Sequence, residues 1–503
     1  MTTRSTDGGS TPTRRARGDW QTPLELARAA LALAIDDARP HPASVVEPTC
    51  GRGAFLVAAR ERLPEATLLG YDLDAAHLGA ARQALKAFAG PASLRQANFF
   101  SHDWRRALAR LPEPILVTGN PPWVTSSVQG ALGAGNLPVK GTRGLSLGRY
   151  GALTGQSDFD ISEWMLLRLI EALAGRQGTL AVLCKSQVAR RVLASDVEAR
   201  FGARPGGLWR LDARRHFRAS VDAVWFVCHF ARGEREPARP GEWPVRGSLD
   251  ASAPEAWLGL RDGALVPDTR RLRETLHLEG LSATEWRSGL KHDCAAVMEL
   301  TREAGGGGSG WVNGLGEVVE LEPSVVFPLL KGADLARSGP DRAVIVPQRA
   351  LGEDTTRLRE TAPRAWAYLT SHRARLDARR SAIYRGRPPF AIFGVGPYAF
   401  APWKVAVSGL HKRLLVSLLG PRGEGAAPVM FDDTCYYLPF DDEAEATRAA
   451  DALRSPLAAD FLSARVFWDA KRPIQKSVLQ RLDLEALARA MGASPSLQAP
   501  PAG

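Results

Sequence analysis

The chain has 503 residues, of which 45% are hydrophobic and 24% are charged, and its formal net charge is +11. No apolar run reaches the roughly 18 residues of a membrane span, and the N-terminus lacks the apolar stretch of a signal peptide. The cysteines are scattered and form no Cys-x-x-Cys pair, so they predict neither a disulfide framework nor a metal site. We therefore expect a cytoplasmic protein of two or three domains whose charge favours a polyanionic partner, although an Arg- and Ala-rich composition also arises from a GC-rich genome.

Predicted helices and strands alternate along the first half of the chain. Residues 1–18 are rich in Ser, Thr, Gly and Arg and are expected to form a disordered tail. Helices are expected over 24–37, from 54, over 75–88 and over 160–173, and strands at 44–46, 67–71, 94–97, 114–118, 179–184 and 225–230. This alternation predicts an α/β fold with a Rossmann-like, mostly parallel sheet that carries helices on both faces.

The second half of the chain follows a polar, Pro-bearing stretch at 231–247, which we take as the domain boundary. The first domain is then expected over 19–235 and a second, α+β domain over 248–490, with a Pro- and Ala-rich disordered tail at 491–503. A glycine run at 305–308 predicts a flexible loop or a further break. Strand-like pieces are expected at 390–400, 403–407 and 435–440.

Ligand-binding side chains are expected at the ends of three consecutive strands of the first domain. The first strand runs into the glycine-bearing turn 47–53, where backbone can approach a ligand closely. Asp72 ends the next strand, about 20 residues on, where a carboxylate can accept hydrogen bonds from ribose hydroxyls. Asn98 follows the third strand and can bond an adenine amine, and the adjacent Phe99 can cover the ring. Open α/β sheets bind ligands at this edge.

The tetrapeptide Asn120-Pro121-Pro122-Trp123 follows the fourth strand. An exocyclic base amine is a poor nucleophile because its lone pair is delocalised into the ring. The Asn120 side-chain oxygen and the Pro121 carbonyl can accept from its two N–H groups, and the prolines restrict the backbone that holds them. Trp123 offers an aromatic face to a base turned out of the duplex. The motif therefore predicts a site that makes a base amine more nucleophilic.

These motifs together resemble those of gamma-class N6-adenine DNA methyltransferases of restriction-modification systems, and residues 19–23 resemble the N-terminal motif of that class. The resemblance implies S-adenosylmethionine as cofactor, with Glu47 near its methionine amino group. Asn98 stands where the family commonly has Asp, and either side chain can accept from the adenine amine. The cofactor-binding residues implied are Thr22, Pro23, Glu47, Thr49, Gly51, Gly53, Asp72, Asn98, Phe99 and Asn120.

The same resemblance implies that the target base is flipped and stacked. Trp123 and Phe217 are the implied stacking residues, and the loop 125–158 is expected to cover the base. The second domain is implied to recognise a specific sequence in double-stranded DNA. Its candidate DNA-binding residues are Arg385, Arg387, Lys404, Lys412, Arg413, Lys471 and Arg472.

Alternative functions stay open at this stage. N4-cytosine methylation uses the same chemistry, although Asn before Pro-Pro favours adenine. An RNA or protein amine methyltransferase can use the same tetrapeptide, and a non-catalytic DNA-binding subunit could keep a decayed fold. The chain contains no Pro-Cys dipeptide, which argues against methylation at cytosine carbon 5. With no nuclease carboxylate cluster apparent, restriction activity is expected in a partner, a separate restriction endonuclease or defence-system subunit.

Overall fold

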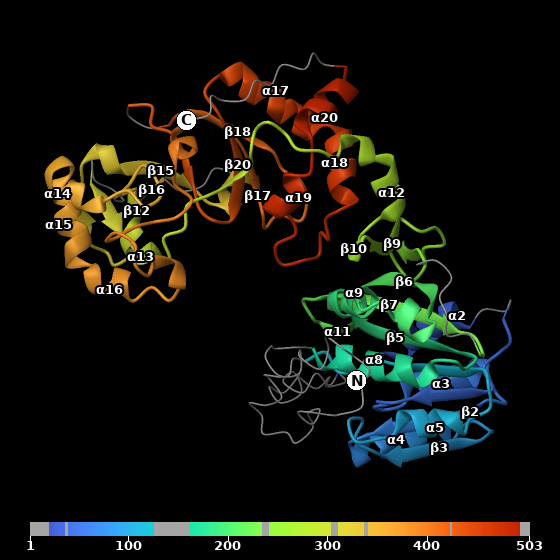
Figure 1. Ribbon diagram of the computed structural model, residues 1–503. Coiled ribbons are helices and arrows are strands. Elements are labelled where there is room, and N and C mark those ends of the chain that lie inside the picture. The colour runs from blue at the N-terminus through green and yellow to red at the C-terminus, as the bar shows by residue number, and fades with distance from the viewer. Residues whose placement is uncertain are drawn as a thin grey trace, which may run out of the picture. The chain divides into compact units, whose positions relative to one another are not determined.

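The computed structural model describes residues 20–35, 39–124, 160–233, 241–302, 310–336, 341–422 and 425–492. The chain divides into two compact units between Thr269 and Arg270 (Figure 1). Several predicted segments lie outside the described residues: the tail 1–18, the loop 125–158, the glycine run 305–308 and nearly all of the tail 491–503.

The first unit is built on a ten-stranded sheet with the order β10-β9-β8-β6-β7-β5-β4-β1-β2-β3. Strands β3, β2, β1, β4 and β5 are parallel to one another, whereas β7 is antiparallel to β5 and β6. The strands are β1 (Ser44–Glu47), β2 (Thr67–Asp72), β3 (Ala92–Gln96), β4 (Ile115–Gly119), β5 (Gly178–Lys185), β6 (Arg204–Asp212), β7 (Asp222–Phe230), β8 (Trp243–Arg246), β9 (Ala256–Arg261) and β10 (Ala264–Val266).

Helices cover both faces of this sheet, which confirms the predicted Rossmann-like class. Every residue of β1 and of β4 is buried, as expected for central strands without a solvent-facing side. The helices of the unit are α2 (Leu24–Ala34), α3 (Ala54–Arg62), α4 (Ala75–Leu85), α5 (Trp104–Ala109), α8 (Ile161–Leu173), α9 (Ser186–Ala194), α10 (Val197–Phe201) and α11 (Ala213–Phe217). Strand β6 and helices α9 to α11 were not predicted from the sequence.

The first unit extends beyond the predicted boundary at 231–247. Strand β8 pairs in parallel with β6, β9 pairs antiparallel with β8, and β10 pairs antiparallel with β9, so these segments belong to the same sheet. The division therefore falls between Thr269 and Arg270. The predicted boundary was too early because a polar, Pro-bearing connection was taken as a linker, although the chain returns to the same sheet after it.

The second unit contains two sheets and several helices, which is an α+β composition. A four-stranded sheet has the order β11-β20-β17-β18 and a six-stranded sheet the order β14-β13-β12-β16-β15-β19. The strands are β11 (Arg287–Ser288), β12 (Glu299–Arg302), β13 (Trp311–Asn313), β14 (Val318–Val319), β15 (Val326–Leu330), β16 (Arg342–Ile345), β17 (Trp403–Ser408), β18 (Ser417–Leu419), β19 (Met430–Phe431) and β20 (Cys435–Phe440). The α-helices are α12 (Thr269–Glu274), α13 (Ala295–Met298), α14 (Leu358–Thr361), α15 (Pro363–Ser371), α16 (Arg373–Asp377), α17 (Glu443–Arg454), α18 (Pro456–Ser463), α19 (Lys476–Leu479) and α20 (Leu484–Ala490).

Two of the three strands predicted in this unit are present. Strands β17 and β20 match the expected segments at 403–407 and 435–440. The segment 390–400 is instead irregular and ends in a short 3-10 helix, Pro397–Phe400. Its apolar residues suggested a strand, but glycines at 394 and 396 and the proline at 397 interrupt any regular pairing.

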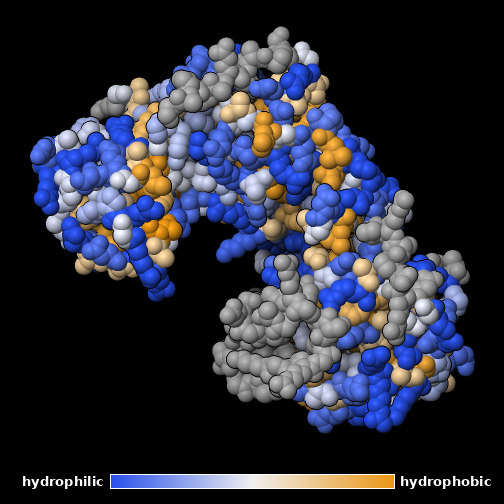
Figure 2. All heavy atoms as spheres, viewed as in Figure 1, coloured by the Kyte–Doolittle hydropathy of each residue, from blue (hydrophilic) through white to orange (hydrophobic). Residues whose placement is uncertain are grey.

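The described surface is mixed in polarity. Figure 2 shows hydrophilic side chains over much of the visible face of each unit, interrupted by apolar patches. Within the residues that the structure describes, no helix combines the length and apolar character needed to cross a membrane.

Candidate active site

The predicted site lies at the carboxyl edge of the parallel strands, where the strand order reverses. Strand β1 pairs with β2 on one side and with β4 on the other, so successive strands are added in opposite directions from this point. Such switch points bind ligands in open α/β sheets. Glu47 ends β1, and Asn120 follows the end of β4. A Cβ added to Gly119 would lie 3.2 Å from Glu47 Cγ, which shows how closely the two strand ends approach.

The glycine-bearing turn is tied directly to Asp72. Gly51 N donates to Asp72 Oδ2 at 2.7 Å, and Asp74 N donates to Asp72 Oδ1 at 2.9 Å. Gly51 and Gly53 have φ values of +50° and +85°, which only glycine adopts without strain. A Cβ on Gly53 would also lie 2.9 Å from Ala81 Cβ. The turn and the strand end that were predicted to bind one ligand are therefore in contact.

Glu47 is an uncompensated carboxyl group in the interior of this site. The side chain is buried, and Oε2 has no hydrogen-bond partner within the described part of the chain. Burial, together with the negative charge of Asp72, raises the pKa of Glu47 well above its ordinary value. A cation placed at Oε2 would relieve both effects.

Asn120 is held with its two polar atoms in different environments. Its Nδ2 donates to the carbonyl oxygen of Trp20 at 3.1 Å. Its Oδ1 is buried and accepts from no donor among the described residues. The bond to Trp20 therefore fixes which end of the amide is the acceptor, and that acceptor is left available to a ligand.

The two predicted stacking residues lie in contact. Trp123 and Phe217 are both buried, and their ring centroids are 5.2 Å apart with an interplanar angle of 74°. This edge-to-face arrangement leaves no room for a base between the rings. A base stacked by both residues would require one ring to move.

The end of the third strand presents Asn98 and two aromatic rings. Asn98 Oδ1 accepts from Phe100 N at 2.9 Å, so one lone pair of this oxygen is left for a ligand. Phe99, the predicted adenine-covering residue, is only 6% exposed and packs against Trp104, with centroids 4.8 Å apart. Phe100 is half-buried and is the more accessible of the two rings. Sequence alone could not separate the adjacent residues because both follow the same strand.

The remaining predicted cofactor residues lie near the turn and in the N-terminal segment. Thr22 and Thr49 are half-buried, and Pro23 is exposed at the start of α2. Gln21, which was not predicted as a site residue, contacts the glycine turn through its side chain, and Arg52 N donates to Gln21 Oε1 at 3.0 Å. The sequence signal for Gln21 was its place in the segment 19–23, which resembles the N-terminal motif of the family.

An ion pair that the sequence did not reveal lies at the end of β5. Lys185 Nζ is 2.5 Å from Asp160 Oδ2, and Asp160 caps the N-terminus of α8. Ile161 N donates to Val124 O at 3.0 Å, so the pair lies close to the residue that follows Trp123. Two charged residues 25 positions apart carry no sequence signal of their pairing.

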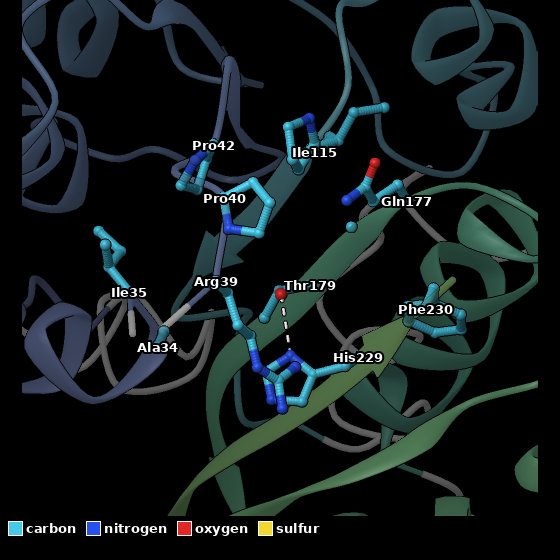
Figure 3. Close-up of a pocket in the computed structure, with 12 residues that line it drawn as sticks. Ala34, Ile35, Arg39, Pro40, Pro42, Ile115, Gln177, Thr179, His229 and Phe230 are labelled. Atoms are coloured by element: carbon cyan, nitrogen blue, oxygen red, sulfur yellow. Dashed lines mark hydrogen bonds between the residues drawn. The ribbon is translucent and has the colours of Figure 1, made fainter. Parts of the chain in front are cut away.

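A separate cavity of about 260 Å³ opens at the opposite edge of the sheet (Figure 3). It is lined by the beginnings of β4 and β5, including Ile115 and Thr179, and by the end of β7. Thr179 Oγ1 lies 3.0 Å from His229 Nδ1 within it. Because the cavity lies at the amino ends of the parallel strands, it is distinct from the site formed by Glu47 and Asn120.

The basic residues predicted to bind DNA differ in exposure. Lys404 is buried, and its Nζ donates to Ala401 O at 2.8 Å, so its ammonium is not available to a phosphate in this structure. Burial lowers the pKa of Lys404 to about 7. The remaining candidates are the half-buried Arg472 and the exposed residues Arg385, Arg387, Lys412, Arg413 and Lys471.

Four of these residues come from two neighbouring loops, which we call the basic cluster: Lys412, Arg413, Lys471 and Arg472. Lys412 Nζ donates to Ala470 O at 2.5 Å, which joins the loops. Arg472 Nε lies 2.9 Å from the position of a Cβ on Gly409, and this nitrogen has no hydrogen-bond partner among the described residues. The fold therefore brings together cations that are about 60 residues apart in the chain.

Comparison with known proteins gives one extensive match. The chain is 39% identical over 488 residues to the type II methyltransferase M.NspV of Nostoc sp., and the match covers 95% of this chain and 98% of that protein. No protein-family model matches the chain.

Solved structures resemble this chain only partly. TrmN from Thermus thermophilus is 24% identical, with 41% of this chain and 48% of that chain covered and a TM-score of 0.26. The methyltransferase subunit of a type I restriction-modification system from Streptococcus thermophilus is 15% identical, with 47% and 51% covered and a TM-score of 0.31. The chain thus spans about half of each of these structures.

Proposed function

The chain belongs to the type II methyltransferases, and we propose that it transfers a methyl group from S-adenosylmethionine to the N6 amine of adenine in a specific sequence of double-stranded DNA. The observation that carries the proposal is a pair of buried acceptors at the topological switch point, Glu47 Oε2 and Asn120 Oδ1, which have no hydrogen-bond partner among the residues that the structure describes. One suits the cationic methionine end of the cofactor, and the other suits the amine that receives the methyl group.

The donor set of the site fits S-adenosylmethionine. Glu47 is a buried carboxylate whose ionised form needs a cation, and the cofactor carries an ammonium group and a sulfonium. Asp72 lies beside the glycine turn, where its oxygens have lone pairs left for ribose hydroxyls. Asn98 and Phe100 follow the neighbouring strand and can contact the adenine ring. The cofactor, when bound, supplies an electrophilic methyl group.

The chain itself contributes alignment and hydrogen-bond acceptors. Asn120 Oδ1 and the carbonyl of Pro121 accept from the two N–H groups of the target amine, which favours a tetrahedral and more nucleophilic nitrogen. Trp20 holds the Asn120 amide in the orientation that this role requires. Placing the amine in line with the methyl group then contributes through proximity. No side chain needs to form a covalent bond with the base.

A flipped base is expected to contact Trp123 and Phe217. Stacking on one aromatic ring is worth about 1–3 kcal/mol per base, which offsets part of the cost of taking the base out of the duplex. Because the two rings are now 5.2 Å apart and edge to face, stacking between them requires them to separate. A base that stacks on Trp123 alone requires no such change.

The second unit is proposed to recognise the DNA. Its basic cluster gathers Lys412, Arg413, Lys471 and Arg472, and further exposed arginines lie at Arg385 and Arg387. Lysine and arginine bind phosphate, and arginine also reads guanine in the major groove. We leave Lys404 out of this set because it is buried. A separate restriction endonuclease is the expected functional partner.

The assignment is tested by transfer of tritium from labelled S-adenosylmethionine to unmethylated genomic DNA, RNA and protein, followed by nucleoside analysis. We expect label in DNA as N6-methyladenine. Label in N4-methylcytosine, in RNA or in protein would identify one of the alternative activities instead.

Asn120→Ala tests the catalytic role directly. The variant is expected to lose methyl transfer while it still binds S-adenosylmethionine in an equilibrium titration, because the removed acceptor serves the target amine. Methylation of DNA at near the normal rate would contradict the assignment.

A further inference from the structure

Two adjacent residues of the N-terminal segment contact two parts of the proposed active site, the Asn120 side chain and the glycine-bearing turn. Asn120 Nδ2 donates to the backbone carbonyl of Trp20 at 3.1 Å, and Arg52 N donates to the side chain of Gln21 at 3.0 Å. We propose that Trp20 and Gln21 are positioning residues that orient the catalytic amide only when their segment is seated on the cofactor-binding turn. This inference rests on the proposed function of Asn120.

The bond to Trp20 decides what Asn120 can offer to a ligand. An asparagine side chain has an oxygen acceptor and a nitrogen donor of similar size, and a free amide can present either. With Nδ2 bound to Trp20, the oxygen is the end that faces the site, and it is buried without a partner among the described residues. A target amine needs that oxygen, since the nitrogen would oppose its N–H groups. Losing the bond allows the inactive orientation.

Gln21 anchors the same segment to the cofactor turn. Its Oε1 accepts from Arg52 N, and it lies 2.7 Å from the position that a Cβ on Gly51 would take. Close packing against a residue without a Cβ keeps the side chain in this position. The peptide between the two residues is rigid, so a shift of Gln21 moves the Trp20 carbonyl with it.

The rest of the segment is fixed on either side of this contact. The Trp20 side chain packs against the hydrophobic core of the first unit, and α2 starts at Leu24. The Gln21 bond therefore acts on a short stretch whose ends are already placed. Its loss is expected to loosen the Trp20 carbonyl without unfolding the unit.

The matched variants are Gln21→Met and Gln21→Glu. Methionine has a similar length but no oxygen acceptor, whereas glutamate keeps an acceptor for Arg52 N. We expect Gln21→Met to slow single-turnover methyl transfer about tenfold at saturating cofactor and DNA, as for one missing hydrogen bond. Gln21→Glu is expected to restore most of the rate. The melting temperature of both variants should stay close to that of the wild type.

A second measurement follows the contact itself. Hydrogen exchange of the Arg52 amide should become faster in Gln21→Met and stay slow in Gln21→Glu, with cofactor present. This readout holds even for a variant of low activity, and it does not depend on which base is methylated.

Several outcomes would overturn the inference. The first is a normal single-turnover rate for Gln21→Met, and the second is a Gln21→Met variant that loses only affinity for the cofactor. The third is a Gln21→Glu variant whose methyl-transfer rate does not recover although the Arg52 amide again exchanges slowly. Absence of methyl transfer to DNA by the wild type would instead contradict the proposed function. In that case unchanged Arg52 exchange in Gln21→Met would still refute the contact.

Discussion

At the scale of single residues, the proposed role of Glu47 predicts that cofactor binding depends on pH. Its pKa is raised by burial and by Asp72, so the protonated form is favoured in the absence of a cation. An ammonium group of S-adenosylmethionine beside Glu47 would favour the ionised form, so binding should release a proton at pH values between the pKa of Glu47 in the complex and its raised pKa in the free protein. The affinity then increases with pH in that range, by up to about tenfold per pH unit.

Isothermal titration calorimetry in buffers of different ionisation enthalpy measures this proton release. Glu47→Gln should bind the cofactor more weakly and without the linked proton. Equal proton release by the variant and the wild type would assign the titration to another group.

The same carboxyl group has a cost for the fold. Because the folded pKa of Glu47 lies above its unfolded value, its contribution to stability declines as pH rises from the unfolded pKa towards the raised folded value. Burial of an ionisable group without a partner is unusual in a structural role and common in binding sites. Asn120 Oδ1 is likewise buried without a hydrogen-bond partner in the described part of the chain, and both residues lie at the strand ends of the switch point.

At the scale of elements, strand β17 contains the buried cation Lys404. The strand pairs with β18 and β20, and its centre is buried, so Lys404 has a pKa of about 7 instead of the ordinary 10.5. Between these two values the unfolded chain binds more protons than the folded protein. The stability of the wild type therefore rises with pH across this window and is independent of this group below about pH 7.

Lys404→Met removes this dependence. In urea denaturation between pH 7 and 10, the stability of the wild type relative to the variant should increase with pH. The exposed Lys471→Met serves as a control and is expected to change the stability by less than about 0.5 kcal/mol. Parallel stability curves for the wild type and Lys404→Met would contradict the burial of this ammonium.

At the scale of the whole molecule, the fold gathers cations of the second unit that are far apart in the sequence into the basic cluster. The basic cluster joins the loop after β17 to the segment before α19 through the Lys412–Ala470 bond. Cations gathered in this way release counterions from DNA when they bind phosphates. Because the proposed catalytic residues lie in the first unit, affinity for DNA and methyl transfer are expected to be separable by mutation.

The double variant Lys412→Ala/Lys471→Ala should weaken binding to target and non-target duplexes alike. The slope of log affinity against log salt should decrease in magnitude by about 0.9 for each DNA phosphate that the variant no longer neutralises. Arg448→Ala, which removes an exposed cation on α17 outside the cluster, is the control. If the control lowers the slope as much as the double variant, the basic cluster has no special role.

Much of the first unit could be predicted from the sequence because its signals are local. Runs such as Val45-Val46 and Ile115–Val117 are apolar without alternation, as in buried parallel strands, and glycine at 51 and 53 marks a turn with positive φ. The residue types at the following strand ends then indicated the cofactor site and Asn120. Because parallel strands place their carboxyl ends at one edge, residues at successive strand ends could be expected to be neighbours.

Other features depend on contacts that no local pattern records, and only the tertiary structure decided them. The polar stretch at 231–247 is followed by strands of the same sheet, because pairing with β6 outweighs the composition of the connection. Lys404 looks like any basic residue in the sequence but is buried where its strand meets two others. The bond from Asn120 to Trp20 joins residues 100 positions apart. The sequence by itself determined which chemical groups the site contains, while long-range packing determined which of their atoms face a ligand.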